Sequence, residues 1–214
     1  MEIQGSCDNK FLEVKEMFES LHSSGREVGS SFAMYKDGKA LIDIWGGYTD
    51  KQKTNPWSRN SLATVWSTTK GVAALTCAIA VEKGLLDYEE KVSHYWPEFG
   101  CNGKEDITIG MLLSHQAGIC GSTTNNVHDY YNQQIMSEEL AAMSPIWKPG
   151  TASGYHSMTY GWLTSELIIR VTGKTLGTFY ADEIGNPNDI DFFIGLPESE
   201  ENRVVEMIPF PKEE

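Results

Sequence analysis

Ser67 and Lys70 stand three residues apart in "VWSTTKG", at the expected start of a long helix. Side chains at positions i and i+3 share one face of a helix, so an amine would lie beside a hydroxyl. If that helix is buried, both burial and the positive end of the helix dipole disfavour the charged form of Lys70. The two residue types therefore fit a serine nucleophile with a nearby proton acceptor.

The same pair also has a purely structural interpretation. The chain contains 18 serines and 13 lysines among 214 residues, so Ser-x-x-Lys is expected about once by chance. Ser67 could simply cap the helix by accepting a backbone hydrogen bond, with Lys70 in solvent. The pattern alone leaves both interpretations open.

Tyr155 is a third group with suitable chemistry. It follows a rigid turn formed by Trp147, Pro149 and Gly150, just ahead of another expected helix. A phenol near Lys70 would have a lowered pKa and could act as base or acid toward Ser67. Taken alone, a loop tyrosine is more often a packing residue or a hydrogen-bond anchor, so the combination carries the argument.

Hydrophobic periodicity and turn residues predict the elements that position these groups. A helix is expected over 9–22, followed by two strands around the turn Lys36, Asp37 and Gly38. Residues 67–83 are apolar on nearly every side and predict a buried central helix that Gly84 ends. Further helices are expected within 108–118, 137–143, 158–173 and 176–185.

The predicted strands are too few for a stable sheet. Two strands alone are marginal in water, so we expect the sheet to be either completed by another chain or left unfinished in this one. We expect residues 1–60 to form the N-terminal helix and hairpin of an α/β part. Residues 61–205 should form a helical part that carries the motifs, and 206–214 a frayed tail.

Composition excludes several classes of function. A formal charge of −13 without a basic run argues against nucleic-acid or anionic-membrane partners. The cysteines and histidines show no metal-ligand spacing, so we expect no metal and no organic cofactor. No segment has the length or apolar character of a membrane span or a signal peptide, which predicts a reduced, cytoplasmic setting.

Four ordered blocks resemble a known family: "VWSTTKGVAAL", "GLLDYEEKVSHYWPEF", "ITIGMLLSHQAGI" and "WKPGTASGYHSMTYGWLTSELIIRVTGK". From about Gly29 to Val205 the chain resembles the serine β-lactamase-related hydrolases, which include the class C β-lactamases, and more closely the esterases built on that fold. The resemblance implies a β-lactamase/transpeptidase-like α/β (α+β) fold. The helical subdomain would be complete here, and the antiparallel sheet subdomain only partly present.

The resemblance also implies roles for particular residues. Ser67 would be the acyl-accepting nucleophile, Lys70 its proton partner, and Tyr155 the tyrosine of the family's Tyr-x-Asn motif. That motif reads Tyr155, His156 and Ser157 here, so His156 and Ser157 are the candidate substrate-binding residues. Serine in place of asparagine favours an ester over a lactam as the substrate.

Three other patterns are weaker candidates. Tyr130, Tyr131 and Asn132 spell Tyr-x-Asn but lack the Trp-x-Pro-Gly lead-in. In the resembled family the block containing His115 is a helix end with a packing role. The segment "TGKT" at 172–175 fits neither a phosphate loop nor the family's third motif, Lys-Thr-Gly or His-x-Gly, which supplies an oxyanion-hole donor from an edge strand.

Three functions therefore remain open for a small ester or amide substrate. The chain could be a serine hydrolase that cleaves esters through an acyl-enzyme, although it lacks the third motif. It could be a truncated family member that is inactive or serves as a binding module. It could also be a D-amino-acid peptidase, transacylase or β-lactamase that uses the same site.

Overall fold

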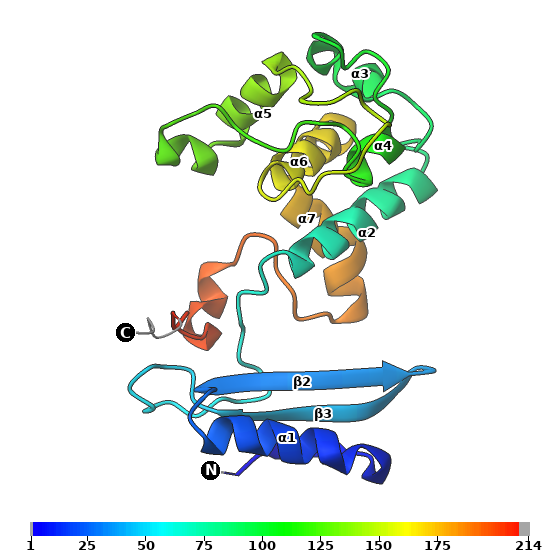
Figure 1. Cartoon of the computed structure of the whole chain (residues 1–214). Helices are drawn as coiled ribbons and strands as arrows, with labels where there is room; N and C mark the ends of the chain where they lie inside the picture. Colours follow the sequence, from blue (N-terminus) through cyan, green and yellow to red (C-terminus); the bar gives the residue numbers. More distant parts are fainter. Residues whose placement is uncertain (1, 210–214) are drawn as a thin grey trace. The chain divides into compact units, whose positions relative to one another are not determined.

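The computed structural model describes residues 2–209, which form two compact units (Figure 1). The first unit comprises residues 2–64 and 196–209, and the second comprises residues 65–195. The second unit lies within the predicted helical part, 61–205, whose first four and last ten residues belong to the first unit. Of the predicted tail, 206–214, only 206–209 lie within the described residues.

A three-stranded antiparallel sheet with the order β1-β3-β2 forms the centre of the first unit. The predicted hairpin consists of β2 (Gly29–Lys36) and β3 (Lys39–Gly47). Asp37 and Gly38 have φ values of 51° and 73°, as a tight two-residue hairpin turn requires. The Asp-Gly pair thus predicted the turn between the two strands.

The sequence pattern did not predict β1 (Gln4–Cys7). Its four residues "QGSC" include a glycine and no β-branched or aromatic side chain, so local strand propensity is low. The strand forms because it pairs with β3, with Gln4 opposite Trp45 and Cys7 opposite Ile42. The sheet therefore has three strands instead of the expected two.

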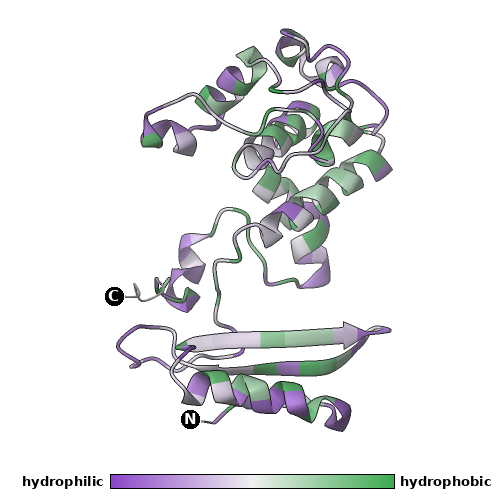
Figure 2. Cartoon of the chain, in the orientation of Figure 1, coloured by the Kyte–Doolittle hydropathy of each residue, from purple (hydrophilic) through white to green (hydrophobic). Residues whose placement is uncertain are grey.

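One face of the sheet is covered by α1 (Leu12–Ser23), as predicted (Figure 1). Phe18 of α1 packs against Ile42 and Ile44 of β3, and all three are buried. In Figure 2 the ribbon of α1 alternates between hydrophilic and apolar residues, which is typical of a helix with one buried face.

The segment 196–209 returns to the first unit through backbone hydrogen bonds. The Val205 N–H donates to the Leu62 carbonyl at 2.9 Å, and the Glu206 N–H donates to the Thr49 carbonyl at 2.8 Å. These contacts join residues more than 140 positions apart in the chain. No local pattern could have assigned this segment to the N-terminal unit.

The second unit is helical, and its core is built mainly from helix-borne aliphatic and aromatic side chains such as Leu112, Leu140, Leu163 and Leu167. Gly84 and Gly173 have positive φ at the ends of two of its helices, where the sequence placed the helix stops. The helices of this unit are α2 (Thr68–Glu82), α3 (Val92–Tyr95), α4 (Ile109–Leu113), α5 (Gln133–Ala142), α6 (Thr159–Thr172) and α7 (Leu176–Tyr180), which continues as a π-helical turn over Ala181–Gly185.

The central helix α2 is less buried than its sequence predicted. Figure 2 shows mainly apolar residues along it, and Cys77 and Ala80 are completely buried. However, Leu75 on the same helix is 49% exposed, and Lys70 is only half-buried. Burial on all sides was therefore wrong, and the argument that full burial disfavours a charged Lys70 loses much of its force.

Lys104 is a fully buried lysine in the second unit. Its Nζ donates hydrogen bonds to the carbonyl oxygens of Cys101, at 2.9 Å, and of Met143, and it lies 5.2 Å from the centre of the Phe99 ring. Burial lowers the pKa of Lys104. The side chain thus joins the loop after residue 100 to the segment that follows α5.

We expect Lys104→Met to lower the free energy of unfolding by about 2–4 kcal/mol, because a buried carbonyl would lose its charged donor. Urea unfolding would measure the change. Lys91→Met is the control, since Lys91 makes an exposed ion pair with Asp106 and should change stability little. Equal effects of the two substitutions would contradict the role given to Lys104.

Candidate active site

Ser67 occupies the N-cap position of α2, directly after a strained turn. The preceding residue, Trp66, has a φ of 48°, a left-handed conformation that costs a non-glycine residue about 1 kcal/mol or more. Its side chain is 70% exposed, so burial of the indole does not compensate for this cost. Backbone strain of this kind is often found at functional sites.

The Ser67 side chain does not cap its helix. Its Oγ accepts no hydrogen bond from the backbone N–H groups of the first turn of α2. It accepts one from the side chain of Lys70, whose Nζ lies at 3.1 Å. Among the described residues, the Ser67 backbone N–H donates to no protein acceptor. The geometry therefore favours the chemical interpretation of the Ser-x-x-Lys pattern over the capping one.

Tyr155 lies near the same ammonium group. Lys70 Nζ is 5.0 Å from the centre of the Tyr155 ring, and Tyr155 is 55% exposed. The pKa of Tyr155 is lowered, chiefly by hydrogen bonding with Ser67 and further by the hydrogen bonding and positive charge of Lys70. The structure thus brings together the three residues that the sequence singled out, although Tyr155 is 85 residues from Lys70 in the chain.

A tightly packed loop carries Tyr155. A Cβ atom on Gly154 would lie 2.4 Å from the Trp147 ring, so only glycine fits against that indole. The Gly150 N–H donates to the Gln116 carbonyl at 3.1 Å, and the Gly154 N–H donates to the His115 carbonyl at 3.0 Å. The loop is therefore anchored to the turn that follows α4.

The two candidate substrate-binding residues have different surroundings. His156 is completely buried, its Nε2 accepts the Ile119 N–H at 3.2 Å, and its Nδ1 lies 2.7 Å from the Gly154 carbonyl. Both ring nitrogens are thus engaged, which differs from the substrate-binding role expected for His156. Ser157 is exposed beside Tyr155 and remains a candidate.

The residues of the weaker candidate motifs, Tyr-x-Asn at 130–132 and "TGKT" at 172–175, cap helices or pack against other side chains. Asn132 caps α5, since its side chain accepts the N–H groups of Gln134 and Ile135. Tyr130 packs against Trp162, with ring centres 5.5 Å apart. Thr175 caps α7 in the same manner as Asn132 caps α5.

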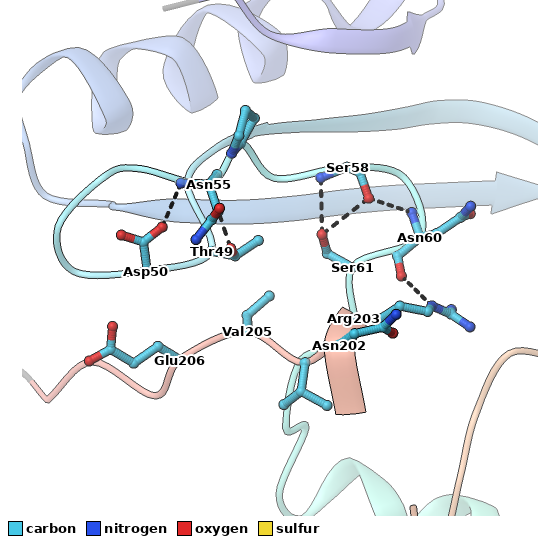
Figure 3. Close-up of a pocket in the computed structure, with 12 residues that line it drawn as sticks. Thr49, Asp50, Asn55, Ser58, Asn60, Ser61, Asn202, Arg203, Val205 and Glu206 are labelled. Atoms are coloured by element: carbon cyan, nitrogen blue, oxygen red, sulfur yellow. Dashed lines mark hydrogen bonds between the residues drawn. The ribbon is translucent and has the colours of Figure 1, made fainter. Parts of the chain in front are cut away.

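A polar pocket of about 580 Å³ lies in the first unit (Figure 3). Ser67, Lys70 and Tyr155 are not among the residues that line it. The figure shows Asp50 hydrogen-bonded to Asn55, and Arg203 hydrogen-bonded to the carbonyl of Asn60. Its polar groups therefore already bind one another within the loop 49–61 and the returning segment.

Two kinds of feature are absent from residues 2–209. No helix in this range is long and apolar enough to cross a membrane. Within the same residues, no group of three or more histidine, cysteine, aspartate or glutamate side chains is arranged to hold a metal ion.

The antiparallel sheet with its helix and the separate helical unit are consistent with a β-lactamase/transpeptidase-like fold, which the comparisons show. A family model described as Beta-lactamase matches residues 14–212. The chain therefore belongs to the beta-lactamase family, as its motifs predicted.

Known relatives include esterases and penicillin-binding proteins. The Esterase/beta-lactamase LipL of Mycobacterium tuberculosis is 37% identical over 206 residues, which are 95% of this chain and 48% of that protein. A solved family VIII carboxylesterase is 42% identical with a TM-score of 0.90, over 98% of this chain and 58% of its own. A penicillin-binding protein homologue from Caulobacter crescentus is 39% identical with a TM-score of 0.92, over 99% and 57%.

This chain thus spans about half the length of the relatives that it matches. The half that it spans contains the Ser67, Lys70 and Tyr155 positions.

The lowered pKa of Tyr155 should depend on Lys70. We expect Lys70→Met to raise it toward the ordinary value, because the phenolate would lose a positive neighbour. Ser67→Ala should also raise it, by removing a hydrogen bond. Ultraviolet difference titration of each variant against the same variant carrying Tyr155→Phe isolates this phenol. An unchanged Tyr155 pKa in Lys70→Met would refute the interaction.

Proposed function

We propose that Ser67 is the nucleophile of a serine hydrolase that cleaves carboxylic esters through an acyl-enzyme. The hydrogen bond from Lys70 Nζ to Ser67 Oγ, at 3.1 Å, is the observation that carries the proposal. It occurs at the start of a helix, where the positive end of the dipole stabilises negative charge on the oxygen. Membership of the beta-lactamase family supports the same assignment.

Tyr155 is the proposed base. Lys70 donates to Ser67 and lies over the Tyr155 ring, so as an ammonium it stabilises a phenolate at Tyr155 and an incipient alkoxide at Ser67. The lowered pKa of Tyr155 increases the fraction of its phenolate form at neutral pH. Lys70 thus acts through its charge and its hydrogen bond, and the Ser67 proton passes to the Tyr155 oxygen.

The proposed reaction has two stages. Ser67 Oγ bonds to the ester carbonyl carbon as its proton moves to Tyr155, and the carbonyl electron pair moves to oxygen. The intermediate then expels the alcohol oxygen, which takes the proton back from Tyr155, and leaves an acyl-serine. A water molecule attacks the acyl group with Tyr155 again as base, and the returning proton restores the Ser67 hydroxyl as the acid leaves.

The oxyanion of each intermediate needs hydrogen-bond donors. The Ser67 N–H, which has no protein acceptor among residues 2–209, is one proposed donor. The family's third motif, which the resemblance assigns to an edge strand, does not occur in the 214 residues. Loss of one oxyanion donor costs roughly 3 kcal/mol, so these residues alone should hydrolyse esters roughly 100-fold or more slowly than a site with both donors.

Two observations favour an ester over a lactam. Ser157 replaces the asparagine of the family motif beside Tyr155 and is exposed there. A structure that matches 98% of the chain is a family VIII carboxylesterase. The relative described as Esterase/beta-lactamase keeps lactam hydrolysis on the same serine as the second candidate.

We expect the purified 214-residue chain to hydrolyse a short-chain p-nitrophenyl ester measurably faster than Ser67→Ala does. A fluorophosphonate probe, which traps activated serines, should label the chain and spare that variant. A chromogenic cephalosporin assayed in parallel tests the lactam alternative. Circular dichroism melting of both proteins controls for folding.

Each contrary outcome has a distinct meaning. Equal labelling of the chain and of Ser67→Ala would refute Ser67 as the nucleophile. A cooperatively folded chain with neither labelling nor turnover would favour an inactive binding module. Faster turnover of the cephalosporin than of the ester would replace the ester assignment with a lactamase one.

A further inference from the structure

His115 holds the backbone on both sides of Tyr155. The N–H of Gly154, the residue before Tyr155, donates to the His115 carbonyl at 3.0 Å. The N–H of His156, the residue after it, donates to His115 Nδ1 at 3.1 Å. A single residue of the turn after α4 thus brackets the proposed base with one backbone and one side-chain acceptor.

The imidazole ring of His115 also contacts three aromatic rings. Its centre is 5.2 Å from that of Tyr155, 4.8 Å from that of Tyr160 and 5.3 Å from that of His156. His115 has a φ of 63°, a left-handed conformation that is uncommon outside glycine. This backbone conformation and these ring contacts fix the direction in which Nδ1 points.

An Nδ1 atom that accepts a hydrogen bond carries no proton. His115 must therefore be neutral, with its proton on Nε2, for the His156 N–H to donate to Nδ1. Burial, and secondly the positive charge of Lys70, lower the pKa of His115, so its neutral form prevails at neutral pH. The titratable or charged groups that face this ring are Lys70, Tyr155, His156 and Tyr160.

We propose that His115 is a positioning residue, which as a neutral imidazole holds Tyr155 beside Lys70 and Ser67 and releases it when protonated. This inference rests on the proposed function of Ser67, Lys70 and Tyr155. Protonation would place an N–H at Nδ1 against the His156 N–H and would add a positive charge near Lys70. Both changes oppose the bracketed conformation, so reactivity of Ser67 should fall as the pH drops through the pKa of His115.

Two substitutions separate the acceptor from the other properties of His115. In His115→Asn, the Oδ1 atom occupies a position similar to Nδ1, and asparagine tolerates positive φ. His115→Gly tolerates positive φ as well but has no acceptor. Both variants lack the ring and both fit the backbone, so they differ in the acceptor and in the small side chain that carries it.

We expect fluorophosphonate to label Ser67 about tenfold more slowly in His115→Gly than in His115→Asn, as loss of one hydrogen bond to the site would cause. Protonation of Tyr155 lowers labelling in both proteins as the pH falls, but the further decline that His115 causes in the wild type should be absent from His115→Asn, which has no imidazole at this position. Equal labelling rates of the two variants, or an identical acid-side decline in the wild type and His115→Asn, would overturn the proposal.

A measurement on the wild-type chain needs no activity and no variant that folds. Nitrogen-15 NMR of the histidine rings at pH 8 should show His115 with its proton on Nε2, and a proton on Nδ1 would overturn the proposal. If the probe fails to label Ser67 at all, the proposed function fails. In that case the NMR result still decides whether His115 Nδ1 accepts the hydrogen bond from the His156 N–H.

Discussion

The Lys70 ammonium touches both of the other groups in the candidate site, donating to Ser67 Oγ at 3.1 Å and lying 5.0 Å from the centre of the Tyr155 ring. One positive charge can stabilise negative charge on either oxygen, so a proton can move between them at low cost. The same charge also contributes to two lowered pKa values nearby, that of Tyr155 after its hydrogen bond with Ser67 and that of His115 after burial.

The rest of the second unit can be understood as support for that contact. The turn at Trp66 and the first turn of α2 present Ser67 and Lys70 from one helix face. A second segment presents Tyr155, and it is anchored to the turn after α4 by backbone hydrogen bonds and by the buried His156. The neutral state of His156 is favoured because burial lowers its pKa, which keeps an uncompensated charge out of the core.

The family and the geometry support the proposal independently. Sequence motifs identify a beta-lactamase family member without any distance, and the distances bring a serine, a lysine and a tyrosine together without any alignment. The two lines of evidence do not decide the substrate, because ester and lactam hydrolysis begin with the same attack by an activated serine. Ser157, which is exposed and follows Tyr155 by two residues, is the proposed determinant of that choice.

Local chemistry in the sequence determined the hairpin turn at Asp37 and Gly38, the helix stops at Gly84 and Gly173, and the pairing of Ser67 with Lys70. Each of these depends on residues within four positions of one another, where backbone geometry leaves few alternatives. Tertiary structure alone decided that β1 joins the sheet, that 196–209 returns to the first unit, that α2 exposes Leu75, and that His156 is buried while Tyr155 is exposed. It also gave His115 hydrogen bonds to the residues before and after Tyr155, which is 40 residues away in the chain. These features arise from contacts between distant segments, and such contacts override local propensity because the free energy of packing exceeds it.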